Sequence, residues 1–253
     1  MSHSSKVISP LRLPASLAVP GVEAFTTLRG HGRSIGPYAG LNLGAHVGDR
    51  AASVAANRQH LCAALGGNIK PVWLEQVHGT RVIAAHAPSS LTADAAWTDR
   101  AGVACAVMTA DCLPVVFAAD HGRCVAVAHA GWRGLAAGIL TSTVNALPVP
   151  ADQLHVWLGP AIGPEVFEVG AEVHASFIDA FGVQAEACFR PAQRRAKWLC
   201  DLYALARLSL AALGCTRITG GERCTLTELS NFYSYRRDGV TGRMATLVYL
   251  APN

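Results

Sequence analysis

Residues 103–119, VACAVMTADCLPVVFAA, contain two strongly apolar runs separated by the tetrapeptide TADC. Each run has the length and the valine-rich composition of a buried β-strand. The polar residues of the stretch lie at the break between the two predicted strands, where the side chains of binding sites are commonly placed. Asp111 and Cys112 are therefore candidate site residues.

The segments on either side repeat this arrangement. Residues 72–85, VWLEQVHGTRVIAA, predict two short strands around His78. Residues 124–134, CVAVAHAGWRG, predict a strand that ends in a glycine-bearing turn at His129. Both histidines thus join Cys112 as polar residues placed where an apolar strand ends.

The rest of the chain alternates predicted strands and helices, which indicates an α/β fold. A glycine-rich polar loop, GHGRSIGPYAGLNLGAHVGD, is too long for a simple turn, and Arg58 lies on the helix predicted after it, with Ser53 as the N-cap. Strands are predicted at 22–28, 154–163 and 244–252, and helices at 53–65, 135–147, 164–181 and 201–213.

The composition supports one globular unit. Hydrophobic residues make up 51% of the 253, charged residues only 15%, and the mean hydropathy is +0.28, enough for a substantial core. No repeat, low-complexity linker or abrupt change of composition marks a boundary. We expect a single domain over residues 1–253, with an irregular N-terminal segment at residues 1–20.

Several partners and locations are not indicated. A net charge of +4, without a run of lysine and arginine, gives no expectation of a nucleic-acid partner. No apolar segment has the length of a membrane span or signal peptide, so we expect a cytoplasmic protein without a membrane partner. The oligomeric state stays open. Of the eight cysteines, we expect most to be small core residues rather than disulfides: Cys62, Cys188, Cys200, Cys215 and Cys224.

His78, Cys112 and His129 together suggest a metal site. Two imidazoles and a thiolate can occupy three of the four tetrahedral positions around zinc and leave one open, as in catalytic sites. Asp94 and Asp111 are candidates to orient the ligands or to transfer protons. Residue type alone leaves another interpretation open: two hydrogen-bonded turn histidines and a buried thiol, since separations of 34 and 17 residues match no compact ligand motif.

Several linked motifs occur in order along the chain: LNLGAHVGD with the later Asn57-Arg58 pair, EQVHGTRV, ADAAWTD, TADCLPV, AHAGWRG, WLGPAIGPEVFEVG and NFYSYRRDGVTGRMATL. In these motifs nearly the whole chain resembles the YfiH family, also called laccase-domain or multicopper polyphenol oxidoreductase proteins. The resemblance implies a single-domain layered sandwich of mixed β-sheets flanked by helices. It also implies that His78, Cys112 and His129 bind zinc and that Arg58 is a catalytic or phosphate-side residue.

The family's older name implies copper-dependent oxidation of phenols. Several coppers would favour closely spaced histidine pairs, and the ten histidines of this chain include no HxH pair. A lone site with Met108 as axial ligand would resemble a blue-copper centre, which transfers single electrons. Zinc is therefore the expected cofactor, and copper with a laccase-like activity is the alternative.

The resemblance also implies purine nucleoside metabolism: phosphorolysis of adenosine, inosine and methylthioadenosine, and deamination of adenosine. Deamination would need zinc-activated water and a carboxylate, Asp94 or Asp111, to move the proton. Phosphorolysis would need cations at the phosphate, for which Arg58 is the first candidate. The expected partners are thus a small nucleoside and phosphate. Further arginines that could assist are Arg133, Arg236 and Arg237.

Two more functional classes stay open on the resemblance: editing of a peptidoglycan precursor, and a metal that only holds the fold. Aromatic residues near the C-terminus, Phe232, Tyr233 and Tyr235, could stack on a purine, but their alternation favours strand packing. They are left out of the predicted site. Trp132, close to His129, could line the site or fill the core.

Overall fold

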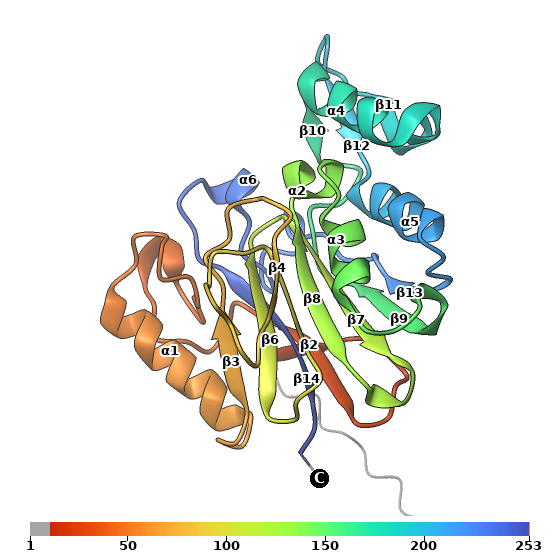
Figure 1. Cartoon of the computed structure of the whole chain (residues 1–253). Coiled ribbons are helices and arrows are strands. Elements are labelled where there is room, and N and C mark those ends of the chain that lie inside the picture. Colours follow the sequence, from red (N-terminus) through yellow and green to blue (C-terminus); the bar gives the residue numbers. More distant parts are fainter. Residues whose placement is uncertain (1–10, 253) are drawn as a thin grey trace, which may run out of the picture.

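Two large β-sheets pack face to face in the computed structural model, which describes residues 11–252 (Figure 1). A five-stranded sheet has the order β1-β2-β14-β6-β3 and a six-stranded sheet the order β13-β9-β7-β8-β5-β4. Each is mixed, because β3 runs parallel to β6, β4 to β5 and β13 to β9, while the other neighbours are antiparallel.

The strands have these bounds: β1 Arg12–Pro14, β2 Val22–Thr27, β3 Lys70–Trp73, β4 Val82–Ala84, β5 Ala95–Thr98, β6 Val103–Thr109, β7 Leu113–Ala119, β8 Val125–Ala130, β9 Leu154–Leu158, β13 Arg217–Gly220 and β14 Met244–Leu250. A third, small sheet contains β10 Glu168–Val169, β12 Trp198–Cys200 and β11 Phe189–Pro191.

Side-chain alternation along the strands creates separate cores on the two faces of each sheet. On β7, Val116 and Ala118 belong to the core between the large sheets, whereas Val115 and Phe117 belong to the core under the helices. Strand β8 follows the same rule, with Val127 facing the other sheet. Because every residue of β7 and β8 is buried, these strands are apolar except for His129 near the end of β8, and they show no polar alternation.

Helices cover the outer faces (Figure 1). Helix α1 (Ala51–Ala64) packs Leu61 on the five-stranded sheet. Helices α3 (Ile139–Ala146) and α5 (Leu202–Ala212) cover the six-stranded sheet. Helix α4 (Ala171–Phe181) lies with the small sheet, and the short helices are α2 (Trp132–Ala136) and α6 (Tyr235–Asp238). Four 3-10 turns lie at Gly36–Tyr38, Asp120–Gly122, Ala151–Gln153 and Gly182–Cys188.

The predicted α/β sandwich of mixed sheets flanked by helices is confirmed, and several element boundaries are corrected. Helix α1 begins after Arg50, so the N-cap assigned to Ser53 is wrong. The helix predicted at 135–147 is two helices separated at Gly138, whose φ of 93° lies in the left-handed region. The helix predicted at 164–181 begins only at residue 171.

The N-terminal segment also differs from its prediction. Residues 12–14 form β1, which pairs with β2, so the expectation of an irregular segment over 1–20 is wrong for these residues. Residues 1–10, for which an irregular segment is also predicted, lie outside the described part of the chain. The same holds for residue 253, the last residue of the predicted single domain. Within residues 11–252, no helix has the length and apolar character to cross a bilayer.

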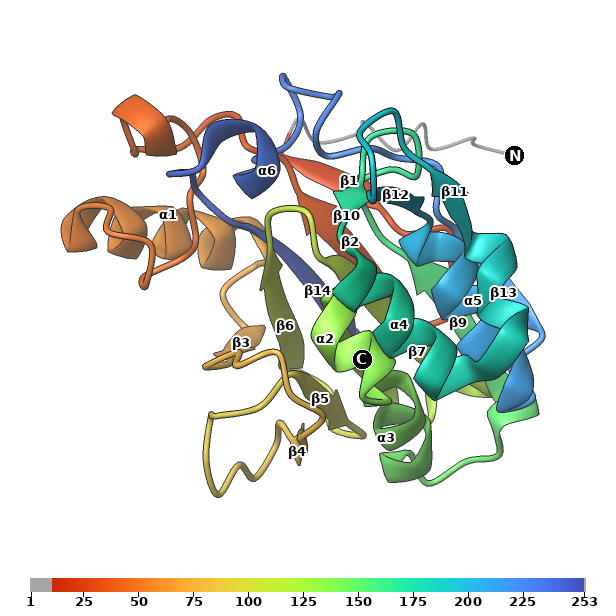
Figure 2. The same ribbon diagram turned by 90° about the horizontal axis from the view of Figure 1, so that it is seen from above.

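Two segments that cross between the two sheets lie at the same end of the sandwich. Residues 74–81 connect β3 of one sheet with β4 of the other, and residues 110–112 connect β6 with β7. Figure 2 looks from above onto the molecule and shows α2 and α6 close to the upper end of β6. The polar strand ends singled out in the sequence therefore meet at this end.

Candidate metal centre and its pocket

His78, Cys112 and His129 lie together, with one ligand atom of each within 4.8 Å of the others. The distance between Cys112 Sγ and His78 Nε2 is 3.9 Å, and the two imidazole rings meet edge to face at 4.7 Å between centroids. Donors bound at about 2.0–2.3 Å to a tetrahedral ion lie roughly 3.5 Å from one another. The three side chains therefore fit a single metal ion, as the sequence predicts.

Strand register explains why residues so far apart in sequence meet. In the antiparallel pair of β7 and β8, Leu113 is opposite Ala130, so Cys112 and His129 both lie at the same end of this ladder. His129 continues the row of Val127, whose side chain faces the other sheet. His78 arrives on the segment that crosses between the sheets, with a left-handed φ of 59°.

The carboxylate of Asp94 accepts hydrogen bonds from His129 and from the backbone of the loop that carries His78. Its Oδ1 accepts hydrogen bonds from His129 Nδ1 at 2.8 Å and from the backbone N–H of His78 at 2.9 Å, and its Oδ2 accepts from the backbone N–H groups of Val77 and Gly79. The residue is fully buried, at 0% exposure. Asp94 therefore fixes the loop of one ligand and turns Nε2 of another toward the site, as a positioning residue.

The charge states suit metal ligation. Burial would raise the pKa of the Cys112 thiol, but the neighbouring imidazoles of His129 and His78 lower it to about 6, so the thiolate is present at neutral pH. Burial would likewise raise the pKa of Asp94, yet the hydrogen bonds from His129 and Gly79 hold it below its usual range. Cys112 and Asp94 raise the pKa of His129 to about 9 against the effect of burial, so metal binding would release a proton from this ring.

Asp111 is bound to the C-terminal segment, and the proton transfer considered for it stays a prediction. Its carboxylate accepts from Thr225 Oγ1 at 2.6 Å, from Ser234 Oγ at 3.0 Å and from the backbone N–H of Arg236 at 2.7 Å. These partners lie on the C-terminal segment that leads to α6. With φ at 96°, Asp111 also turns the chain sharply beside Cys112. The geometry shows it fastening α6 to the metal-binding loop.

Gly131 is a residue of the centre that the sequence analysis did not single out. A Cβ placed on it would lie 2.9 Å from His78 Cδ2, 3.0 Å from Cys112 Sγ and 3.6 Å from His129 Nε2. Its backbone conformation is ordinary, with φ of −62°. The requirement for glycine is therefore one of space behind the three ligands, which motif spacing does not show.

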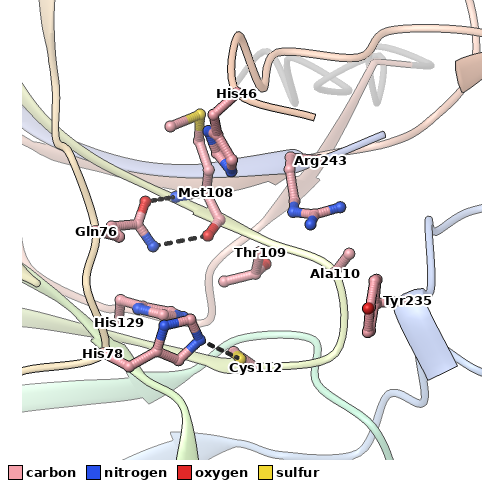
Figure 3. Close-up of a pocket in the computed structure, with 10 residues that line it drawn as sticks. All are labelled: His46, Gln76, His78, Met108, Thr109, Ala110, Cys112, His129, Tyr235 and Arg243. Atoms are coloured by element: carbon pink, nitrogen blue, oxygen red, sulfur yellow. Dashed lines mark hydrogen bonds between the residues drawn. The ribbon is translucent and has the colours of Figure 1, made fainter. Parts of the chain in front are cut away.

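The three ligands open into a pocket of about 340 Å³, here called the metal pocket (Figure 3). No Asp or Glu is among the described residues that line it. Arg243, at the start of β14, contributes a guanidinium group whose Nη1 donates to the backbone oxygens of Thr241 and Gly242. The lining residues are His46, Gln76, His78, Met108, Thr109, Ala110, Cys112, His129, Tyr235 and Arg243.

Two features make this pocket suitable for an anion. Within residues 11–252, Arg243 has no carboxylate in ion-pair contact. Burial lowers its pKa, although the charges of Cys112 and Asp111 act to raise it. Thr109 Oγ1 is buried and has no hydrogen-bond partner within the described chain. An unpaired buried hydroxyl costs roughly 1–3 kcal/mol, and a ligand oxygen in the pocket would remove that cost.

Arg58 lies beside the metal pocket rather than in its lining. Its Nε and Nη2 donate to the backbone oxygen of Leu43, and its guanidinium stacks on Trp73 at 4.2 Å. It lines a neighbouring groove that shares His46, Gln76 and Met108 with the metal pocket. Burial, Arg243 and Arg58 together lower the pKa of His46, so this imidazole is neutral at pH 7. A catalytic role for Arg58 stays a prediction.

The structure also places the aromatic residues and one of the arginines that the sequence analysis considered near the C-terminus. Tyr235 begins α6, is 61% exposed and lines the metal pocket, so its assignment to strand packing is wrong. Phe232 and Tyr233 are fully buried and lie in no strand. Arg237 is bound to Asp238 and to three backbone oxygens, which gives it a structural role.

Comparison with known sequences identifies one family. Residues 23–251 match the family described as multi-copper polyphenol oxidoreductase laccase. A Pseudomonas aeruginosa protein named as a purine nucleoside phosphorylase is 50% identical over 229 residues, which cover 90% of this chain and 93% of that protein. The Escherichia coli K12 protein named purine nucleoside phosphorylase YfiH is 49% identical over 247 residues, covering 96% and 100%.

Solved structures show the same fold. A Neisseria meningitidis protein of the DUF152 family superimposes with a TM-score of 0.91 at 44% identity, covering 96% of this chain and 100% of that one. A Bacillus licheniformis protein called YfiH superimposes with a TM-score of 0.89 at 28% identity, covering 97% and 98%. The layered arrangement that forms the metal pocket is therefore shared with these proteins.

Proposed function

The chain belongs to the multi-copper polyphenol oxidoreductase laccase family, and from this premise we propose that it is a zinc enzyme that cleaves purine nucleosides with phosphate. One observation carries the proposal: the three candidate metal-binding side chains share a pocket with the guanidinium of Arg243, which makes no ion pair within residues 11–252, and no described carboxylate lines that pocket. The names of the Pseudomonas and Escherichia coli relatives support the same activity.

Zinc is the metal that suits these ligands. Two imidazoles and a thiolate match the ligand classes of zinc, and a set of three leaves one position free, as in catalytic sites. Within residues 11–252 they form the one group of three such side chains, whereas oxidation by several coppers requires several ligand sets. When bound, zinc would supply positive charge and Lewis acidity at the pocket.

The reaction transfers a ribosyl group from nitrogen to oxygen. A phosphate oxygen forms a bond with C1′ of the ribose while the bond between C1′ and the purine nitrogen breaks, and its electron pair stays with the purine. The proton carried by dihydrogen phosphate passes to the purine, which gives ribose 1-phosphate and the free base. Arg243 and the Thr109 hydroxyl are placed to hold the phosphate, because a guanidinium binds such oxygens in pairs.

Deamination of adenosine receives less support from the geometry. Zinc deaminases use a carboxylate near the metal to move the proton. Asp94 is fully engaged by four donors and Asp111 by three, and neither lines the metal pocket. The proposal is therefore limited to phosphorolysis, with inosine, adenosine and methylthioadenosine as substrates to compare.

The test is phosphate-dependent base release by zinc-loaded protein, with metal content measured on the same sample. We expect ribose 1-phosphate and free base only when phosphate is present, and loss of both zinc and activity in Cys112→Ala. Arg243→Gln is expected to raise the KM for phosphate at least tenfold with zinc retained. Arg190→Gln removes an exposed guanidinium from the small sheet and serves as the control. Base release that is independent of phosphate would refute the proposal.

A further inference from the structure

A second cavity of about 140 Å³ lies against the metal pocket. It is called the aromatic compartment here because its walls include Trp132, Phe167 and Tyr235. The two cavities share Ala110, Cys112 and Tyr235, so they meet beside a metal ligand. Figure 3 shows Tyr235 on the same side of the metal pocket as Ala110 and Cys112.

The two cavities differ in chemistry. The metal pocket presents imidazoles, an amide and a guanidinium, whereas the aromatic compartment is lined mainly by apolar groups, including Ile162 and Leu202. Its cation, Arg236, lies over the Phe167 ring at 5.3 Å and is held by a hydrogen bond to the backbone oxygen of Glu168. The carboxylate of Asp111 is saturated by its own partners.

A nucleoside has the same division: a polar ribose and a flat aromatic base. Displacement at C1′ requires the attacking phosphate and the departing base to lie on opposite sides of that carbon. The metal pocket and the aromatic compartment meet at Ala110, Cys112 and Tyr235. This adjacency suits an arrangement with phosphate beside Arg243 and the base among the aromatic rings. Stacking on aromatic side chains binds any purine, since every base has a π-face.

Resting on the proposed phosphorolysis, we propose that the aromatic compartment is the purine-binding subsite. Tyr235 is the residue that borders both ligands, with its ring available to the base and its helix fixed to the metal-binding loop by Asp111. Leu202, at the first turn of α5, is a buried residue that lines the subsite.

The test is calorimetric titration of zinc-loaded protein with hypoxanthine, a probe that needs no turnover. Tyr235→Ala removes an exposed ring, and Leu202→Phe fills the compartment. Each variant is expected to weaken hypoxanthine binding about tenfold or more and to raise the KM of the nucleoside by a similar factor. Zinc content is expected to stay unchanged in both variants, and the KM for phosphate is expected to stay unchanged in Leu202→Phe, because Leu202 does not line the metal pocket. Val240→Ala, an exposed position just after α6, is the matched control.

The outcomes separate this inference from the proposed function. If hypoxanthine binds the parent protein and this binding is lost in Tyr235→Ala, the result supports the subsite even when no phosphorolysis is found. A different result would overturn the subsite and leave the activity intact: the protein catalyses phosphorolysis, but neither the affinity for hypoxanthine nor the KM of the nucleoside changes in Tyr235→Ala and Leu202→Phe. Absence of hypoxanthine binding to the parent protein would also overturn it. If Leu202→Phe does not fold, the exposed Tyr235→Ala decides alone.

Discussion

Gly131 has an ordinary backbone conformation, yet a side chain at its position would contact all three metal ligands. Gly131→Ala is therefore expected to displace the ligands and to lower zinc content severalfold, with the fold retained. Metal analysis and circular dichroism on the same sample provide the measurement. Gly30→Ala, where nothing lies within 4 Å of the added carbon, is the control. Full zinc content in Gly131→Ala would contradict the tight packing of the centre.

Asp94 is also a residue whose effect is exerted through its neighbours. Asp94→Asn keeps the shape of the side chain but replaces one carboxylate oxygen, which accepts hydrogen bonds, with an NH2 group, which donates them. His129 and the loop of His78 therefore lose some of the hydrogen bonds that hold them. Loss of such outer partners typically weakens metal affinity about 10–100-fold. Competition with a zinc chelator measures this change. Asp99→Asn, a partly exposed position, is the control, and equal affinity in both variants would argue against the positioning role.

Helix α6 depends on Asp111 for its place beside the metal pocket. Asp111→Ala leaves Thr225, Ser234 and the N–H of Arg236 without their acceptor, and hydrogen bonds to a charged group contribute roughly 1.5–3 kcal/mol. We expect at least this loss in urea unfolding, together with faster tryptic cleavage at Arg236. A proton-transfer residue would instead lower kcat and leave unfolding unchanged, which is the result that would contradict the structural role.

The segment before α6 carries a pH-dependent contact. Glu228 accepts hydrogen bonds from Arg223, from the N–H of Cys224 and from Asn231, and the Arg223 contact, against the effect of burial, holds its pKa below the usual 4.5. A depressed folded-state pKa gives stability that is present above the unfolded value and lost as the pH falls.

The corresponding test uses Glu228→Gln. The difference in unfolding free energy between the parent protein and this variant is expected to be full near neutral pH and to shrink as the pH falls below about 4.5 toward the folded pKa. Urea titrations across this range provide the measurement, with Glu165→Gln, an exposed position, as the control. A difference that does not vary with pH would show that the carboxylate charge is unimportant.

At the scale of the whole molecule, the metal centre links segments that cross between the two large sheets. Ligands arrive from the β3–β4 connection, the β6–β7 connection and the end of β8. A free zinc concentration of 100 times the Kd would stabilise the folded state by about 2.7 kcal/mol. Removal of zinc by a chelator is therefore expected to lower Tm, and readdition to restore it. Cys112→Ala should show no such response, and an equal shift in that variant would place the zinc elsewhere.

Much of the fold and of the centre was accessible from the sequence. Apolar runs of strand length predict β6, β7 and β8, and the ordered motifs identify His78, Cys112 and His129. The strand predictions succeed because burial on both faces requires continuous apolar strands. The three residues lie together in the structure, and their role as metal ligands stays a prediction that rests on residue type. Helix ends were less accessible: Ser53 suits an N-cap by type, but loop geometry placed the cap at Arg50.

The tertiary structure alone decided which polar residues share the pocket. Asp94 and Asp111 have the same side chain, and only strand register and the path of the C-terminal segment assign one to the ligands and the other to α6. Arg243 and Tyr235 enter the site because β14 pairs with β6 and α6 folds back over the junction. Such contacts join segments more than 100 residues apart, and no local pattern encodes them. The sequence by itself predicted the three residues of the candidate metal centre, whereas packing determined what surrounds them.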